Sequence, residues 1–413
     1  MELARRRAAL EDWSLGGWPD VAGAEVSGMS CGPTPDWDYD FGCASDFGGF
    51  GGFAFVSCTG AFRGMECCFD DGTRFVAGLV ATPMLSYYDG TRDEAFLKEE
   101  LVPYLRGVAE FYESYAVDGD LPFTCAQETC NSDPKVAQHN NHQDLAYARM
   151  VYRRLIDFGD DVERWSKSLA ALAPFPLANA SRGRVFAEAV NAGPAQPKPD
   201  SNAAYAITHL AAIWPGRLVD AASARVDREL LSVARNTVAL VNDVTDFAPG
   251  NGFVLNWPAS ALVVDGRDAG ALWANLSAAY ARRATPNGWP DLGGGGLEQN
   301  GALAAVGFAL ARVVDGGVLR LFAGWPDDAP AAFERLRVDG AFLLSASREA
   351  RAPLARLAVS AERGGDLRIP ADAFAAAALC DASGPLPRAD DAACDACFRL
   401  ATEAGGTYVV RAC

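Results

Sequence analysis

Apolar residues recur at helical spacing through most of the chain before residue 316. In the segment 96–115 they fall on one helical stripe: Leu97, Leu101, Leu105, Val108, Tyr112 and Tyr115. This spacing predicts a helix with one buried face. Pro103 predicts that a second helix starts there or that the first is kinked, because proline cannot continue the helical hydrogen bonding. Further helices are predicted at 142–158, 162–173, 227–243, 266–283 and 298–314.

The period of the pattern changes near residue 318, where short β-type runs alternate with turn-forming residues. These runs lie at 317–326, 340–349, 353–365 and 366–370. Many helices followed by several strands predict a helical domain with a β-domain appended. We therefore expect residues 1–316 to form the helical domain, with an irregular, Gly-rich part at 1–74, and residues 317–413 to form the β-domain.

Tryptophan is concentrated before proline. Five of the nine tryptophans have this neighbour: Trp18, Trp214, Trp257, Trp289 and Trp325. The residue before a proline is disfavoured in the helical region, so these rings are expected in loops or at the ends of elements. Two roles stay open for them. The rings could plug the ends of a helical barrel, or some could form platforms on which sugar faces stack.

The charge of the chain excludes some partners. Its 53 acidic and 36 basic residues leave a net charge of −17. Nucleic acids and anionic membrane surfaces attract basic proteins, so neither is an expected partner. We find no apolar run of about 20 residues, the length that crosses a bilayer, and no hydrophobic segment of a secretory signal after the basic start. A neutral ligand is compatible with this charge.

The cysteines and histidines offer weak metal signals. Cys394 and Cys397 have the two-residue spacing of a zinc ligand pair, but no second pair accompanies them. Disulfides or free thiols are therefore favoured for the last four of the eleven cysteines. His139 and His142 could also be a ligand pair, although capping of the start of the following helix is favoured. We expect no metal and no cofactor.

Two glutamates remain as candidates for catalysis. Glu128 lies in "PFTCAQETCNSDP", between two predicted helices, and Glu298 follows four glycines at the start of another. Two acids on separate loops of a helical barrel are typical of glycoside hydrolysis, in which one protonates the leaving oxygen and the other activates water or attacks the sugar. An inverting enzyme would hold the carboxyl groups about 6.5–9.5 Å apart. Taken alone, each glutamate could also be a charge that complements a helix dipole.

Several segments resemble glycoside hydrolase family 95, the α-L-fucosidase-like six-hairpin enzymes. "GGGGLEQNGALAAVGFALARVVDGGVLRLFAGWP" resembles the end of the family's barrel and the start of its β-domain. "SNAAYAITHLAAIWPG" is similar to its His-Leu…Tyr-Pro-Gly segment, and "CAQETC" falls where the family carries Ser-Pro-Glu-Asn. The resemblance extends from about residue 75 to 365 and rests on the order of the motifs, since no single one is very specific.

The resemblance implies a fold, a reaction and site residues. The fold would be mainly α, an (α/α)6-type barrel followed by a small C-terminal β-sandwich-like domain. The reaction would be inverting removal of α-linked L-fucose or a related sugar from a polysaccharide or glycan, with Glu128 as acid and Glu298 on the base side. The best-known members carry Asp at the latter position and two upstream Asn residues, which we do not find here. The expected sugar contacts are His209, Asn140, Asn141, Trp257, Asn300 and Trp214.

Two other functions stay open. One is a carbohydrate-binding protein on the same scaffold that has lost its water-activating group. The other is a polysaccharide lyase, which would need a Tyr, His or Lys base and a basic subsite for uronates, a subsite that this acidic chain is poorly suited to form. The compartment is left open, although the family and the cysteine content favour the secretory pathway or the outside of the cell.

Overall fold

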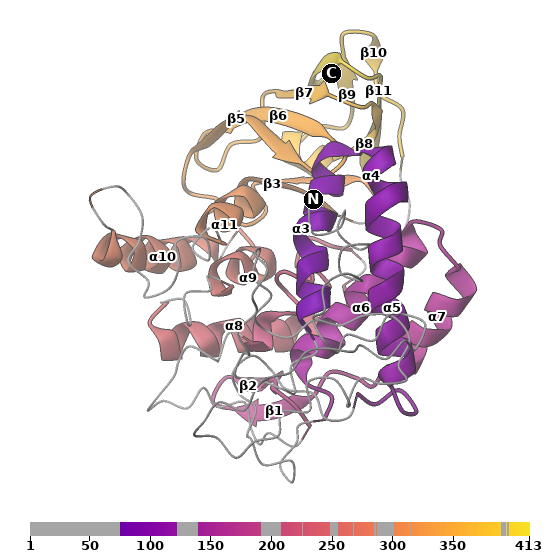
Figure 1. The fold of residues 1–413 in the computed structure, drawn as a ribbon. Helices are drawn as coiled ribbons and strands as arrows, with labels where there is room; N and C mark the ends of the chain where they lie inside the picture. Colours follow the sequence, from indigo (N-terminus) through magenta and orange to yellow (C-terminus); the bar gives the residue numbers. More distant parts are fainter. Residues whose placement is uncertain are drawn as a thin grey trace. The chain divides into compact units, whose positions relative to one another are not determined.

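A computed structural model of the protein describes residues 75–121, 139–190, 208–247 except 225, 255–286 except 267 and 285, 301–389 except 315, 394, and 396–413 (Figure 1). These residues divide into two compact units. The first unit holds the described residues of 75–85, 94–180 and 184–190. The second holds 86–93, 181–183 and the described residues from 208 onward.

The first unit is mainly helical. Its elements are α3 (Val76–Thr91, whose last six residues belong to the second unit), α4 (Glu94–Phe96), the π-helical turn η2 (Leu97–Leu101), α5 (Val102–Tyr115), α6 (His142–Asp157), α7 (Val162–Ala171) and the hairpin of β1 (Leu177–Ala180) with β2 (Gly183–Phe186). Pro103 stands in the first turn of α5. Leu101 and Val102 before it have helical dihedral angles, and the Val102 N–H donates to the Leu97 carbonyl oxygen, so the chain stays helical from η2 into α5. Pro103 therefore does not start a separate helix; it follows a π-helical irregularity within one helical stretch.

The core of this unit forms from the predicted apolar stripe. Leu105, Val108 and Tyr112 on α5 are fully buried, and α5 packs against α6, which in turn packs against α7. Helix α3 comes close to α6 at Gly78, where any side chain would collide with the side chain of Tyr147. Glycine is therefore required at this contact.

The second unit begins with helices that pack around α9. They are α8 (Arg228–Thr245), α9 (Asn256–Val263), α10 (Ala269–Arg283) and α11 (Gly301–Leu310), and α9 contacts each of the other three (Figure 1). Asp227 caps α8, because its side chain accepts a hydrogen bond from the Leu230 N–H at 2.7 Å.

Ten strands follow in the same unit. They are β3 (Ala311–Val314), β4 (Val318–Leu321), β5 (Ala331–Val338), β6 (Phe342–Arg348), β7 (Leu357–Ala361), β8 (Gly365–Pro370), β9 (Leu379–Asp381), β10 (Gly384–Pro385), β11 (Cys397–Thr402) and β12 (Gly406–Ala412). One sheet has the order β10-β9-β12-β7-β6-β5 and the other β11-β8-β4-β3. The pairs are antiparallel except β4 with β8. Both sheets contribute to one apolar core, with Leu344 and Val359 from the first and Leu319 and Leu367 from the second.

The helix predicted at 298–314 is wrong at its C-terminal end. Helix α11 ends at Leu310, and residues 311–314 form β3, which pairs with β4 through the register Val313 to Leu319. A turn containing Gly316 and Gly317, both at positive φ, joins these two strands. The β-branched pair Val313–Val314 favours a strand once β4 is available as a partner. Strand β5 and strands β9 to β12 were not predicted.

The mixture of helices and sheets agrees with the predicted fold class. The closed (α/α)6-type barrel, the β-sandwich and the boundary at residue 316 stay predictions. None of the described helices combines the length and the apolar composition that crossing a membrane requires.

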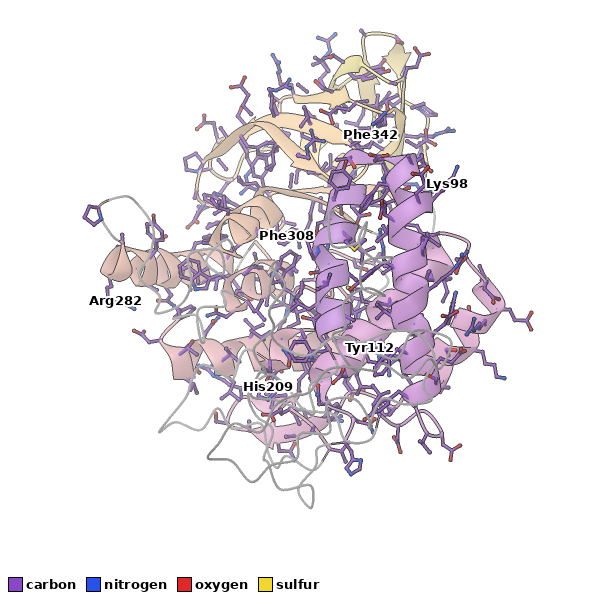
Figure 2. All side chains as sticks on the ribbon, in the orientation of Figure 1. Lys98, Tyr112, His209, Arg282, Phe308 and Phe342 are labelled. Atoms are coloured by element: carbon purple, nitrogen blue, oxygen red, sulfur yellow. A yellow bond between two sulfur atoms is a disulfide. The ribbon has the colours of Figure 1, made fainter. Side chains whose placement is uncertain are left out.

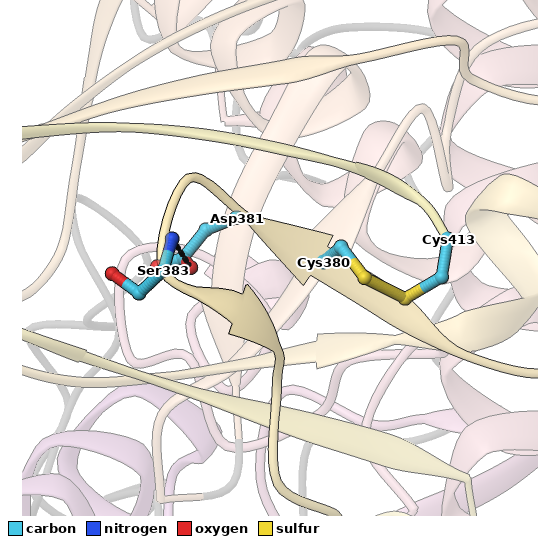
Figure 3. The surroundings of a disulfide bond; sticks show 4 residues. All are labelled: Cys380, Asp381, Ser383 and Cys413. Atoms are coloured by element: carbon cyan, nitrogen blue, oxygen red, sulfur yellow. Dashed lines mark hydrogen bonds between the residues drawn. A yellow bond between two sulfur atoms is a disulfide. The ribbon is translucent and has the colours of Figure 1, made fainter.

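The four C-terminal cysteines form two disulfides, one of the alternatives that the sequence left open. Cys380 on β9 is bonded to Cys413, 33 residues later, and Cys394 is bonded to Cys397, 3 residues later. Figure 3 shows the first bond beside the turn in which the Ser383 N–H donates to the Asp381 carboxylate at 2.7 Å. No group of three or more possible metal ligands occurs among the residues that the structure describes.

The two disulfides differ in the length of chain that they close, so their removal has different expected costs. Replacing Cys380 and Cys413 together by Ala is expected to lower the free energy of unfolding by roughly 4 kcal/mol, since the closed loop is long. Replacing Cys394 and Cys397 together should cost roughly 2 kcal/mol by the same entropic argument. Urea-induced unfolding of both double variants measures the difference. A larger loss for the second pair would contradict the chain-entropy explanation.

Candidate functional site

The residues predicted to carry the chemistry, Glu128 and Glu298, lie outside the described residues, and so does Asn300. The structure does describe the chain at the ends of the segments that contain them. The segment with Glu128 follows Leu121 and precedes His139, and the segment with Glu298 precedes Gly301.

Asn140 bonds the two ends of the Glu128 segment to each other. Its backbone N–H donates to the Leu121 carbonyl oxygen at 2.9 Å, and its side-chain oxygen accepts from the Leu121 N–H at 2.7 Å. Its side-chain NH₂ group donates to Asp120 at 2.7 Å. Asn140 is 5% exposed and has a φ of 51°, a left-handed conformation that Asn tolerates better than most residues. We call these contacts of Asp120, Leu121 and Asn140 the loop stem.

A second set of contacts holds the residues that follow the loop. The His142 N–H donates to the Glu188 carbonyl oxygen at 2.7 Å, and the Val190 N–H donates to the His139 carbonyl oxygen at 3.1 Å. The His142 ring is fully buried, with its centroid 4.5 Å from that of Phe186. His142 is the first residue of α6, and the residue that caps this helix is Asn141, so the favoured prediction that the two histidines cap it is wrong.

Asn141 and Asp144 form a buried polar network at the start of α6. Asn141 caps the helix by accepting from the Asp144 N–H at 3.0 Å, and its NH₂ group donates to one Asp144 carboxylate oxygen at 2.8 Å. The other carboxylate oxygen accepts from the Tyr112 hydroxyl at 3.0 Å. All three residues are fully buried. Burial raises the pKa of Tyr112 well above its usual value, and the Asp144 carboxylate raises it further. This hydroxyl is therefore a hydrogen-bond donor, not a base.

The second unit holds the other predicted sugar contacts. His209, which is labelled in Figure 2, is buried, with 4% of its surface exposed. Trp214 is half-buried, and its ring lies edge-on to that of Phe308 with the centroids 5.0 Å apart. Trp257 stands in the first turn of α9 with 4% exposure, and its indole N–H donates to the Phe247 carbonyl oxygen at 2.8 Å. The position of these Trp-Pro pairs outside helix interiors is confirmed; contact with a sugar stays a prediction.

Sequence reasoning missed a buried polar network between α8 and α9. The Asn242 NH₂ group donates to the Ser260 hydroxyl at 3.0 Å, and the Asn256 NH₂ group donates to the Asn242 side-chain oxygen at 3.2 Å. The Ser260 hydroxyl donates to the Asn256 carbonyl oxygen at 2.6 Å. These side chains are almost fully buried. Asn242 lies in a predicted helix as an interior polar residue, but nothing in the sequence shows that its partners lie on α9.

The described contacts divide the predicted site residues into two groups. Asn140 and Asn141 are neighbours in the first unit, whereas His209, Trp214 and Trp257 belong to the second. Asp144 and Tyr112 join Asn141 although neither was predicted as a site residue. Asp144 carries a local signal, since it lies three residues after a capping Asn. Tyr112 was predicted only as an apolar stripe residue, because its partner is distant in the sequence.

The loop stem makes Asn140 a sensitive position. Asn140→Ala is expected to lower the free energy of unfolding by about 2–4 kcal/mol, since it leaves the buried Leu121 N–H without its acceptor and puts Ala in a left-handed conformation that Asn tolerates better. Urea-induced unfolding measures this loss. Asn140→Gly is the matched control: it removes the same hydrogen bonds but relieves the backbone, so it should lose less than the Ala variant. If neither variant changes stability, the stem does not hold the loop.

No protein-family model matches the chain, and no curated protein matches it. Similar solved structures include the α-L-rhamnosidase of Streptomyces avermitilis complexed with L-rhamnose, at 14% identity and a TM-score of 0.41 over 79% of this chain. Another is a human-microbiome protein provisionally named a kojibiose phosphorylase, at 9% identity and a TM-score of 0.45 over 74% of this chain.

This chain spans only part of each of those proteins, 32% of the first and 49% of the second. Both are named for reactions on sugars. Their TM-scores are below 0.5, so the function of this chain has to be argued from its own residues.

Proposed function

We propose that the protein is a glycoside hydrolase that removes α-linked L-fucose or a related sugar from a glycan with inversion of configuration. Glu128 protonates the leaving oxygen, and Glu298 activates the attacking water. The resemblance to family 95 supports this assignment, because its motifs occur in the family's order over about residues 75 to 365.

The observation that carries the proposal is the loop stem. A general acid must be held within hydrogen-bond reach of the oxygen that it protonates. The loop that carries Glu128 is closed at its base by three hydrogen bonds of Asn140, each between 2.7 and 2.9 Å. The residues that follow it are anchored to Glu188 and to the buried Asp144. This support is what a loop that presents a catalytic residue needs.

The buried groups at the start of α6 have a supporting role. Asn141, Asp144 and Tyr112 satisfy one another inside the protein. Asn141 and Asp144 therefore fix the start of α6, and with it the return of the Glu128 loop. Under this proposal they are positioning residues, and a sugar contact by Asn141 would require its cap to break.

The proposal is tested by the products formed from an aryl α-L-fucoside and an aryl α-L-galactoside. Proton NMR of the first product formed, before mutarotation, distinguishes the two anomers. We expect the β-anomer, as inversion requires. The α-anomer would overturn the inverting mechanism.

The competing functions give other results in the same assay. A carbohydrate-binding protein would bind the free sugars without releasing the aryl group from either glycoside. A lyase would be inactive on these substrates and would form unsaturated, ultraviolet-absorbing products from a uronate polysaccharide.

A further inference from the structure

A cavity of about 550 Å³ lies among the strands of the second unit. Its walls come from the end of β4 and the turn after it, the end of β6 and the connection to β7, and the short 3-10 helix η6 (Ala371–Phe374). Pockets for small ligands occupy roughly 300–1,000 Å³, so this cavity has a suitable size. None of the residues predicted for catalysis or sugar binding lines it.

One wall of the cavity is fixed by Arg348. The Arg348 guanidinium lies 4.9 Å from the centroid of the Phe322 ring and donates to the Pro326 carbonyl oxygen at 2.8 Å. It also pairs with Asp327 at 3.4 Å, and its side chain is only 13% exposed. Three different contacts therefore hold this guanidinium before any ligand arrives, which lowers the entropy lost on binding.

Backbone strain is concentrated at the same cavity. Phe322, Arg351 and Ala375 line it and have φ values of 56°, 58° and 48°. Residues with a Cβ are uncommon in this left-handed region and pay about 1 kcal/mol or more for it. Such strain persists where the surrounding structure imposes it, and ligand sites are frequent places for it.

The cavity has balanced charge and spare hydrogen-bonding capacity. Its charged residues are two arginines and two aspartates, Arg348, Arg351, Asp327 and Asp372. Arg351 and Asp372 are exposed, and within the described part of the chain neither side chain forms a hydrogen bond or an ion pair. The lining therefore offers one guanidinium donor group and one carboxylate acceptor group, with Pro353 and Leu354 as apolar surface beside them.

We propose that this cavity is a second, non-catalytic binding site for a neutral saccharide unit. A sugar hydroxyl both donates and accepts hydrogen bonds, so adjacent hydroxyls can donate to the Asp372 carboxylate and accept from the Arg351 guanidinium. The C–H face of the ring packs on Pro353 and Leu354. A ligand with a net charge would leave one of the two groups opposed by a like charge. The inference does not depend on Glu128 or Glu298, so it goes beyond the proposed hydrolysis.

The test is calorimetric titration of the full chain with L-fucose, L-rhamnose and D-galactose, and with glycine as a zwitterionic probe. Arg351→Ala and Asp372→Asn are each expected to raise the Kd for a sugar about tenfold, as for the loss of a hydrogen bond to a charged group. Both residues are exposed, so neither substitution removes core packing. Arg399→Ala, at another exposed arginine of the strands, is the matched control and should change the Kd less than about twofold. Glu128→Gln should leave it unchanged.

Three results would overturn the proposal. The first is that no neutral sugar binds. The second is that Glu128→Gln weakens sugar binding while Arg351→Ala and Asp372→Asn leave it unaffected, which assigns the binding to the hydrolytic site. The third is that glycine binds in place of the sugars, and that its binding depends on Arg351 and Asp372 in the same way. Unfolding midpoints of all variants confirm that the protein titrated is folded.

Discussion

Glu128→Gln is expected to lower kcat/KM for a natural glycan by about 10²–10⁴, the usual contribution of general acid catalysis. The amide keeps the shape of the carboxylic acid but cannot give a proton to the leaving oxygen. The loss should depend on the leaving group. A nitrophenolate leaves without protonation, so an aryl fucoside should lose much less activity than a glycan with a sugar leaving group.

The pH dependence of kcat/KM gives an independent readout for the same variant. Activity that requires a protonated acid falls as the pH rises through the pKa of that acid, so the wild-type profile should have an alkaline limb. This limb should disappear in Glu128→Gln. Glu298→Gln is the matched comparison, since a base-side residue is needed for every leaving group, and its loss should be similar for aryl and natural substrates. An equal loss for both leaving groups in Glu128→Gln would contradict its assignment as the acid.

Asp220→Asn is expected to lower the free energy of unfolding by about 3–5 kcal/mol, the usual cost of leaving one member of a buried ion pair without its partner. Arg312 on β3 donates to both Asp220 carboxylate oxygens at 2.8 Å, and its side chain is 1% exposed. Asp220 precedes α8, so the pair joins the helices of the second unit to their first strand. Neutralising Asp220 leaves the Arg312 charge buried and uncompensated.

The control for this prediction is an ion pair on the surface of the same unit. Arg182 pairs with Asp243, and the two side chains are 50% and 46% exposed. Asp243→Asn should cost less than about 1 kcal/mol, because water already solvates both charges. Adding Arg312→Met to Asp220→Asn should recover part of the larger loss, since the buried cation is then gone. Urea-induced unfolding compares the four proteins, and similar losses for the Asp220 and Asp243 variants would refute the argument from burial.

The contacts of the candidate site could be predicted only where both partners lie within a few residues of each other in the sequence. Asn141 lies three residues before Asp144, a spacing that capping by itself explains. Asn140 pairs with Asp120 and Leu121, which lie 20 and 19 residues earlier, so nothing near Asn140 in the sequence indicates this pairing. Asn140 was predicted as a sugar contact, and the structure adds a role in closing the loop. Its side chain is held by contacts that only the folded chain creates.

The cavity beside Arg348 could not be predicted from the sequence for the same reason. Arg348 and Arg351 are close together in the sequence, but Asp372 lies on η6, after two further strands, and none of the three belongs to a recognisable motif. Their convergence depends on the register of β6 with β7 and on the position of η6. The positive φ values at Phe322, Arg351 and Ala375 also have no signal in residue type, because glycine and asparagine are the residues expected there.

The sequence by itself determined the helices with a strong apolar period and the change from helices to strands. These features depend on spacing and on backbone restrictions within a few residues, so they can be read along the chain. The tertiary structure alone decided that residues 311–314 leave the helix to pair with β4, that Cys380 finds Cys413, and that Arg312 finds Asp220. Each of these contacts needs a partner that folding brings close. Its contribution to stability therefore cannot be inferred from the neighbouring residues in the sequence.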